Sequence, residues 1–480
     1  MFHRVTLSDS TQKNAESTMS TFLTPLETWT LLDTWVVVIG ALAAMACALP
    51  GCFLLLRKQS LMGDAISHTS LLGVVGAFFV SHWLVEAKVI SPATELSVRH
   101  VAMCLGAIVV GVLSAWLTES LQKLGNVESS AALGVVFTSL FALGLLLIRA
   151  FADNVHIDLD CVLYGEIVTA PLETVGDSGV PRAVIVNGVV LTINLLLTVL
   201  LFKELRLSAF DPALATTLGI PAQLMHYGLM GLTAMTLVAA FESVGSILVI
   251  AMLIIPPATA YLLTDRLPRM IGLSLLIGVL SAALGHASAL TLPLLISRSI
   301  GIADVQDASS AGMMAAAAGF LFVLAMLLGP KYGLVVRVWH RLLLKLRIAG
   351  EDVLGRLYRF EESAPPDLSA ASSRVALLRK ITSQSWVSRL ATWLLIRRGW
   401  LIDSGADVHL TDIGREAARK LVRSHRLWES FLAKHFVLGE GHFHESAEKV
   451  EHFLDPELLA ELDHDLDRPG VDPHGRAIPK

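Results

Sequence analysis

The chain has 480 residues, of which 54% are hydrophobic and only 16% carry a charge, with a mean hydropathy of +0.63. This composition excludes an ordinary soluble protein, and a net charge of -5 is too small to indicate a nucleic-acid partner for the chain as a whole. The apolar residues are concentrated before Leu328, whereas the sequence after Lys331 is typical of a soluble domain. We therefore expect a membrane-embedded body followed by a soluble tail.

Residues 1–30 are polar and lack the basic and then apolar pattern of a signal peptide, so we expect an external tail there. The apolar runs that follow number about nine, each near the length that the hydrocarbon core of a bilayer requires. They are 32–56, 65–80, 101–117, 131–148, 183–202, 225–241, 244–263, 270–296 and 311–328. The second, sixth and ninth runs are short, and an eight-span chain would move the N-terminus inside without moving the tail.

The basic residues next to these runs indicate the orientation of the chain. Under nine spans they fall on one side of the membrane, which the positive-inside rule assigns to the cytoplasm. These residues are Arg57, Lys58, Lys123, Lys203, Arg206, Arg266, Arg269, Lys331 and Arg337. We expect a multi-pass protein of the inner membrane with a cytoplasmic tail.

Ionisable residues inside or beside spans are unfavourable in hydrocarbon and therefore mark candidate functional positions. Asp64 and His68 lie one helical turn apart, so both side chains can point at one ion. The alternative is that Asp64 caps a helix and His68 bonds to a neighbouring helix. Glu242 and His286 are weaker candidates, because a single histidine in a span is more often a packed, hydrogen-bonded residue.

The segment 203–222 lies between two apolar runs on the expected cytoplasmic side. Asp211 followed by Pro212 is typical of a helix start, and Gly219 followed by Pro221 is typical of a helix end. The pattern predicts a short surface helix. Such a helix can dock a cytoplasmic partner or serve as a simple connector.

Four segments of this body resemble the permeases of the ABC importers for zinc, manganese and iron. They are LMGDAISHTSLLG at 61–73, ALGVVFTSLFALGLLLI at 132–148, FDPALATTLGIP at 210–221 and ESVGSILVIAMLIIPPATAYLLT at 242–264, within a similarity that covers 31–333. The resemblance implies that Asp64 and His68 lie in the metal path. It also implies that 210–221, with Phe210, Asp211, Pro212, Ala215 and Gly219, is the coupling helix that docks on the ATPase.

The same resemblance implies the partners of the chain. The sequence has no Gly-x-x-x-x-Gly-Lys-[Ser/Thr] loop, so we expect no enzymatic activity here and ATP hydrolysis in a separate ATPase subunit. An external metal-binding protein would deliver the ion. A second permease, either another copy or a paralogue, would complete the pathway.

The tail begins with a basic amphipathic stretch and linker at 334–368, which can contact membrane lipid. From Ser369 onward, helical periodicity predicts two helices, the second ending at Gly399, and then a small hairpin over 400–410. This order is typical of a winged helix. We therefore expect a mostly α protein: a transmembrane helical bundle, then a small winged-helix and helical metal-binding domain at 369–480.

A metal-ligand pattern, His444-x-x-x-Glu448-x-x-Glu451-His452, follows in the tail. On a helix these four side chains fall within an arc of roughly 100°, so their imidazole and carboxylate groups converge on one face. The alternative is that they form ordinary exposed ion pairs.

The surrounding segments, 410–432, 444–454 and 472–479, resemble the metal-dependent repressors of the diphtheria-toxin-repressor and manganese-regulator family. The resemblance implies that His425, Glu448, Glu451 and His452 are primary or shared metal ligands and that Glu429 and His444 form an ancillary site. Asp352 matches a further ligand, but Gly355 stands at the next acidic position, and Pro365 and Pro366 predict an interrupted helix before Ser369.

The ligand types bear on the identity of the metal. Glu448 stands where iron-responsive members of the family carry cysteine, and a carboxylate-rich set favours manganese, with iron or zinc as alternatives. The candidate DNA-recognition helix at 383–399 offers a modest set of residues for phosphate and base contacts, namely Ser383, Gln384, Ser385, Ser388, Arg389, Arg397 and Arg398.

The sequence therefore predicts the permease subunit of an ATP-driven divalent metal importer, manganese first, that carries a metal-sensing domain. A membrane-anchored, metal-dependent transcriptional regulator that binds DNA is the alternative. The coupling segment at 210–221 disfavours that alternative, since an anchor needs no ATPase dock.

Overall fold

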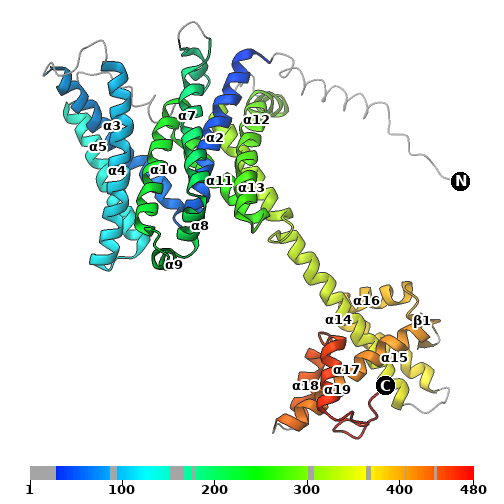
Figure 1. Cartoon of the computed structure of the whole chain (residues 1–480). Coiled ribbons are helices and arrows are strands. Elements are labelled where there is room, and N and C mark those ends of the chain that lie inside the picture. Colours follow the sequence, from blue (N-terminus) through cyan, green and yellow to red (C-terminus); the bar gives the residue numbers. More distant parts are fainter. Residues whose placement is uncertain are drawn as a thin grey trace. The chain divides into compact units, whose positions relative to one another are not determined.

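The computed structural model describes residues 29–86, 95–151, 167–175, 179–300, 308–363, 369–405, 407–436 and 440–479 (Figure 1). The expected external tail lies outside these residues up to position 28, as does the expected linker at 364–368. The chain divides into two compact units, which we call the membrane unit, Met1–Val336, and the C-terminal unit, Arg337–Lys480. Each is described by itself below.

The membrane unit is built from helices in the part of the chain that the structure describes. In the described ranges these are α2 (Leu31–Leu56), α3 (Ser60–Glu86), α4 (Glu95–Gly125), α5 (Ser129–Phe151), α7 (Arg182–Leu200), α8 (Phe202–Phe210), α9 (Pro212–Thr217), α10 (Ala222–Val244), α11 (Ser246–Leu263), α12 (Leu267–Ile300) and α13 (Ser310–Leu328), with the short 3-10 helix η1 (Ala170–Leu172). Within those ranges, 9 helices are long and apolar enough to cross a membrane, which confirms the expected number.

The three runs that are short in the sequence belong to helices of sufficient length. The second candidate span covers Ser60–Ser81, the sixth Ala222–Val244 and the ninth Ser310–Leu328, with 22, 23 and 19 residues. Polar residues such as Ser60 and Gln223 extend the second and sixth helices beyond their apolar cores.

Local sequence signals explain several helix ends. Thr30 caps α2, where its side chain and that of Asp33 form a reciprocal capping box. Lys58 adopts φ 58 in the tight turn between α2 and α3. Gly245 adopts φ 78 and separates α10 from α11, so two helices replace what would otherwise be one continuous apolar stretch.

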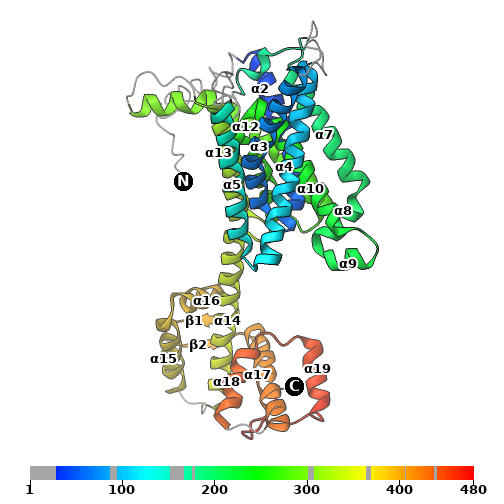
Figure 2. The same ribbon diagram turned by 90° about the vertical axis from the view of Figure 1, so that its left-hand side faces the viewer.

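The membrane unit has two lateral groups of helices joined by α10 (Figures 1 and 2). Helices α3, α4 and α5 contact one another, while α2 contacts α7, α11 and α12, and α10 contacts both α4 and α2. The buried core of this unit includes Phe53, Leu237 and Met252. Helices α8 and α9 lie together at one end of the bundle.

Glycine lets α2 approach α11 very closely. A Cβ at Gly51 would lie 2.0 Å from the carbonyl oxygen of Leu253, far inside van der Waals contact. Small residues at such crossings are the usual means of packing helices in a membrane, because lipid provides no hydrophobic drive for helix association. The contact between α2 and α11 therefore requires glycine at this position.

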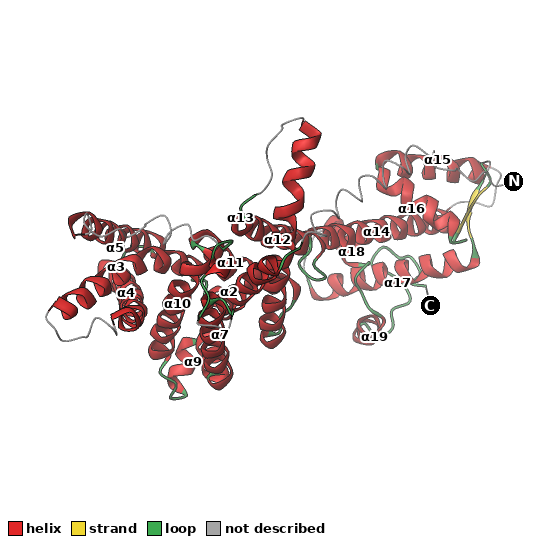
Figure 3. Cartoon of the chain, turned by 90° about the horizontal axis from the view of Figure 1, so that it is seen from above, coloured by secondary structure: helices red, strands yellow, loops and turns green. Residues whose placement is uncertain are grey.

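The C-terminal unit is helical apart from one hairpin in its described residues (Figure 3). Its elements are α14 (Leu334–Ser363) from Arg337 onward, α15 (Ser369–Gln384), α16 (Trp386–Arg397), β1 (Leu401–Asp403), β2 (Val408–Leu410), α17 (Asp412–His435), α18 (Glu440–Val450) and α19 (Pro456–Asp465). The strands are antiparallel, with Leu401 opposite Leu410. Two helices and a hairpin thus follow one another as expected, and Gly399, at φ 70, follows α16 as predicted.

Helix α14 differs from the sequence interpretation. It continues without interruption to Ser363, so the helix is regular from Gly355 to Ser363, where a poorly formed helix was expected; the predicted interruption at Pro365 and Pro366 lies outside the described residues. The two prolines at 365 and 366 lie beyond its end and so break no hydrogen bond within it. Val353, Leu354 and Leu357 pack with Leu395 in the core of the C-terminal unit, which therefore includes residues that precede the expected boundary at 369.

We predict that Gly51→Ala destabilises the protein, because the added methyl group collides with the backbone of α11. Overpacking of this kind lowers the free energy of unfolding by about 1–3 kcal/mol. Gly188→Ala is the matched control, since a Cβ there meets nothing within 4 Å and alanine favours the helix. Thermal unfolding of the detergent-solubilised variants tests this, and equal stability of the two would contradict it.

Candidate metal centre

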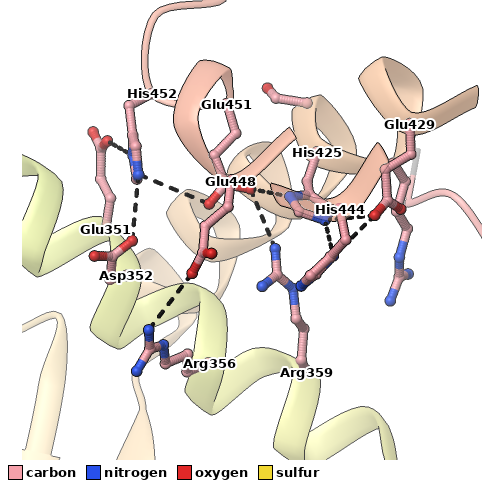
Figure 4. Close-up of polar contacts among 12 residues, drawn as sticks. Glu351, Asp352, Arg356, Arg359, His425, Glu429, His444, Glu448, Glu451 and His452 are labelled. Carbon is pink, nitrogen blue, oxygen red and sulfur yellow. Dashed lines mark hydrogen bonds and ion pairs between the residues drawn. The ribbon is translucent and has the colours of Figure 1, made fainter. Parts of the chain in front are cut away.

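Among the described residues of the C-terminal unit, two groups of side chains could hold a metal ion (Figure 4). The first donor group is His425, Glu429 and His444, and the second donor group is Asp352, Glu451 and His452. Within each group the possible ligand atoms all lie within 4.8 Å of one another. Imidazole nitrogen combined with carboxylate oxygen suits Mn, Fe and Zn, so the donor chemistry fits a divalent transition metal.

The first donor group is positioned by α17 and α18. His425 and Glu429 lie one turn apart on α17, with His425 Nε2 3.0 Å from Glu429 Oε1. Nδ1 of His444, from α18, lies 2.9 Å from the same oxygen. Burial alone would raise the pKa of Glu429, but the hydrogen bond and charge of His425, followed by those of His444, lower it to about 2. This carboxylate is therefore ionised and ready to bind a cation.

The second donor group brings α14 against the end of α18. His452 Nε2 lies 3.3 Å from Asp352 Oδ1, and its Nδ1 lies 2.8 Å from Glu351 Oε2. Burial alone would lower the pKa of His452, but the hydrogen bonds to Asp352 and Glu351 raise it to about 9. The ring is protonated at neutral pH, so a metal ion that binds Nε2 must displace a proton.

Glu451 connects the two donor groups. Its Oε2 lies 2.5 Å from His425 Nδ1, and its Oε1 lies 3.9 Å from His452 Nε2. The Glu451 side chain is only 3% exposed, and its Oε2 also accepts a hydrogen bond of 3.2 Å from Arg359 Nη2. A single buried carboxylate is therefore shared by two histidines and an arginine.

The structure brings six of the seven expected ligands into these groups and leaves one outside. Glu448 faces Arg356 at 3.6 Å and belongs to neither donor group. The expected single helical face from His444 to His452 is wrong, because α18 ends at Val450 and the last two ligands lie in the following turn. His444 consequently joins one donor group, while Glu451 and His452 join the other.

His425 also differs from its expected place. The resemblance grouped it with Glu448, Glu451 and His452. Its ring does contact Glu451 through Nδ1, but Nε2 lies beside Glu429 and His444. A buried imidazole with a partner on each nitrogen has a fixed orientation.

Two residues that the sequence reasoning missed lie next to the ligands. Glu351 accepts from the distal nitrogen of His452, an arrangement that orients metal-binding histidines. Arg359 stands two helical turns after Asp352, so helical spacing from that ligand is the signal that could have identified it. Gly355, at the position with no ligand, packs tightly, since a Cβ there would lie 3.1 Å from Leu421 Cδ2.

In the membrane unit, Asp64 and His68 lie close together on α3. His68 Nε2 is 3.6 Å from Asp64 Oδ1, and the side chains are 35% and 44% exposed respectively. The histidine ring also approaches Phe137 and Phe141 of α5. The alternative of a capping Asp64 is wrong, because α3 begins at Ser60 and Asp64 lies within the helix.

The weaker membrane candidates have structural partners. Glu242 forms an ion pair with Arg182 at 3.1 Å. His286 is buried and lies 3.1 Å from both Asp33 Oδ1 and Ser310 Oγ, which fits the expectation of a packed, hydrogen-bonded histidine.

The segment at 210–221 forms the predicted short helix, α9. Asp211 caps it by accepting from the backbone N–H of Leu214 at 2.9 Å, Pro212 occupies the first turn, and Gly219, at φ 81, follows its end. Ala215 is buried against the bundle. Phe210, Leu214 and Leu218 are instead 63%, 45% and 63% exposed, so this end of the membrane unit carries an apolar knob formed by these three residues.

The outer side of α16 is more apolar than a DNA-reading helix usually is. Trp386, Trp393 and Ile396 are 57%, 48% and 38% exposed. The guanidinium of Arg397 stacks over Trp393, with 4.5 Å between Cζ and the ring centroid. The hydroxyl of Ser385 caps the helix instead of facing outward.

Comparisons with known proteins agree with both units. Residues 411–480 match the sequence model described as iron dependent repressor, metal binding and dimerisation domain. The chain is 41% identical over 321 residues to the manganese transport system membrane protein MntD of Bacillus subtilis, covering 66% of this chain and 99% of the relative. It is 40% identical over 391 residues to the zinc transport system membrane protein TroD of Treponema pallidum, covering 80% and 97%.

Among solved structures, PsaBC from Streptococcus pneumoniae in complex with Fab is 30% identical, with a TM-score of 0.49 over 65% of this chain and 97% of that chain. A manganese-dependent transcriptional repressor in complex with manganese is also 30% identical, with a TM-score of 0.24 over 27% and 58%. The model described as ABC 3 transport family matches residues 31–329, more than half of the chain. The chain therefore belongs to the ABC 3 transport family of membrane permeases and carries a repressor-like metal-binding domain at its C-terminal end.

Proposed function

We propose that this protein is the permease subunit of an ATP-driven importer of divalent metal, manganese first and zinc or iron next. The observation that carries the proposal is the family match together with the close manganese and zinc transport relatives. The chain itself is a conduit and no enzyme. ATP is hydrolysed by a separate ATPase subunit, and an external metal-binding protein delivers the ion.

Asp64 and His68 are the residues that we assign to the metal path. A divalent cation cannot cross hydrocarbon with its water shell, so the path must supply oxygen and nitrogen ligands that replace water. The pair offers one of each on adjacent turns of α3, and both side chains are partly exposed. Two ligands bind weakly enough to release the ion again, which a conduit requires.

The apolar knob of α9 is the surface that we assign to the ATPase. Phe210, Leu214 and Leu218 expose large apolar side chains next to a capped, rigid turn of helix. A rigid apolar projection fits into a pocket on a partner with little loss of conformational entropy. A second permease copy or paralogue would supply the other half of the pathway.

The excess of lysine and arginine beside one end of the spans supports an inner-membrane location with the C-terminal unit in the cytoplasm. There the two donor groups would bind the imported metal after it has crossed, so the C-terminal unit would act as a sensor of the cytoplasmic pool. Their carboxylate-rich composition favours manganese. The basic start of α14 would contact membrane lipid.

We predict that Asp64→Ala and His68→Ala abolish metal accumulation, because each removes half of the ligand pair in the path. Uptake of Mn in cells that carry the intact importer measures this, with Zn and Fe as comparison ions. Ser288→Ala is the control, since that hydroxyl donates to the backbone oxygens of Leu284 and Gly285 in its own helix. Normal accumulation of all three metals in both variants would refute the assignment.

We predict that Leu214→Asp separates the permease from its ATPase, because a charge on the knob has to be desolvated in the interface. Copurification of the two subunits should fall at least about tenfold, which corresponds to about 1.4 kcal/mol. Ile402→Asp is the matched control, since Ile402 is likewise 45% exposed but lies in the hairpin. If the ATPase binds the Leu214 variant normally, α9 is only a connector.

We predict that Asp352→Ala and Glu451→Ala affect Mn²⁺ binding differently. Asp352 belongs to the second donor group alone, whereas Glu451 also contacts His425 of the first. The first variant should lose one binding event, and the second should weaken both by about 10–100-fold. Calorimetry on the full chain measures this, with Asp403→Ala in the hairpin as control. Identical titrations for the two variants would mean that Glu451 does not link the groups.

A further inference from the structure

Arg359 lies at the carboxylate that joins the two donor groups. Its Nη2 donates to Glu451 Oε2 at 3.2 Å, and its side chain is 22% exposed (Figure 4). One turn earlier on α14, Arg356 faces Glu448 at 3.6 Å, where both side chains are more exposed. Each of the two glutamates that the sequence singled out at 448 and 451 is thus opposed by an arginine of α14.

The charge of Arg359 is permanent, unlike the charges of the histidines around it. A histidine can give up its proton when a metal ion approaches its ring nitrogen. A guanidinium cannot be deprotonated in a protein, so Arg359 remains a cation in every state of the site. Any divalent ion that binds Glu451 therefore meets a like charge within a few ångströms.

The burial of Glu451 strengthens this competition. The carboxylate is 3% exposed, so water screens its interactions weakly and its attraction to the guanidinium is larger than on the surface. Of its two oxygens, Oε2 is taken by His425 and Arg359, and Oε1 faces His452. A metal ion must displace Arg359 from this carboxylate or share the carboxylate with it.

We propose that Arg359 is a built-in competitor of the metal ion for Glu451 and sets a low affinity in the second donor group. This inference rests on the proposed function of the C-terminal unit as a metal sensor. A sensor attached to an importer has to remain empty at the metal concentrations that the cell needs and to fill only above them. A fixed positive charge at the shared ligand raises that threshold without removing any ligand.

The alternative role for Arg359 is to position Glu451 for metal binding. An arginine that only holds Glu451 in position would support metal binding, as outer-shell partners of metal ligands commonly do. Its removal would then weaken binding. The competitor role requires that removal of the charge strengthens binding, so the two roles differ in the sign of the effect.

The experiment uses the full chain in lipid nanodiscs and Mn²⁺ alone as the probe, with free Mn²⁺ measured by electron paramagnetic resonance. Arg359→Gln should bind about tenfold more tightly, whereas Arg359→Lys, which keeps the charge, should stay near the wild-type affinity. The double variant Asp352→Ala with His452→Ala gives the background from all other sites. Arg415→Gln is the matched control, since it also removes an arginine from an ion pair, here with Glu361 at 2.8 Å.

Arg359→Met keeps the apolar stem of the side chain and serves as a second neutral variant if the glutamine variant unfolds more easily. Tighter binding in either folded neutral variant supports the inference. Unchanged or weaker binding overturns it and leaves the sensor function intact. If wild-type protein binds no more Mn²⁺ than the Asp352 and His452 double variant, the sensor function fails and the inference fails with it.

Discussion

The C-terminal unit depends on the neutralisation of its buried carboxylates, and Glu451 is the one that lies between α14 and α17. A carboxylate with a 3% exposed side chain is stable only if cations or hydrogen-bond donors surround it. These come from three directions: His425 of α17, Arg359 of α14 and, at a longer distance, His452 in the next position of the chain. Helices distant in sequence therefore have to meet at this point, and the metal-binding groups lie on either side of it.

The candidate ligands of the membrane unit are less buried than those of the C-terminal unit. This difference matches the proposed tasks, which are passage of the ion in the first and sensing of the ion in the second. Asp64 and His68 are partly exposed, with 3.6 Å between their nearest ligand atoms, and within the described residues no third carboxylate or imidazole joins them. Two exposed ligands can replace part of a hydration shell and still let the ion go. The donor groups of the C-terminal unit offer three ligands each, of which all but the half-buried Asp352 and the exposed His444 are buried, and this suits retention of an ion rather than its passage.

The sequence predicted the fold better than the site. Spans, the α9 helix and the hairpin are local features, so apolar length, the Asp211-Pro212 start and Gly399 were enough to identify them. The grouping of ligands around one ion depends on how α14, α17 and α18 pack against one another. A local sequence pattern carries no information on that packing. Helical spacing placed Glu448 with Glu451, but the helix ends at Val450 and only Glu451 turns toward His425.

The surface of α16 bears on how the sensor would act. The major groove presents hydrogen-bond donors and acceptors, so a reading helix needs outward polar side chains. Here Trp386 and Trp393 occupy the outer side, and Arg397 is stacked on one of them. Arg374 of the preceding helix forms two hydrogen bonds, of 2.9 and 2.8 Å, with Asp407 beside the hairpin. Arg389, Arg397 and Arg398 are nevertheless exposed, so the helix combines cations that can contact phosphate with an apolar face that offers little hydrogen-bond readout of bases.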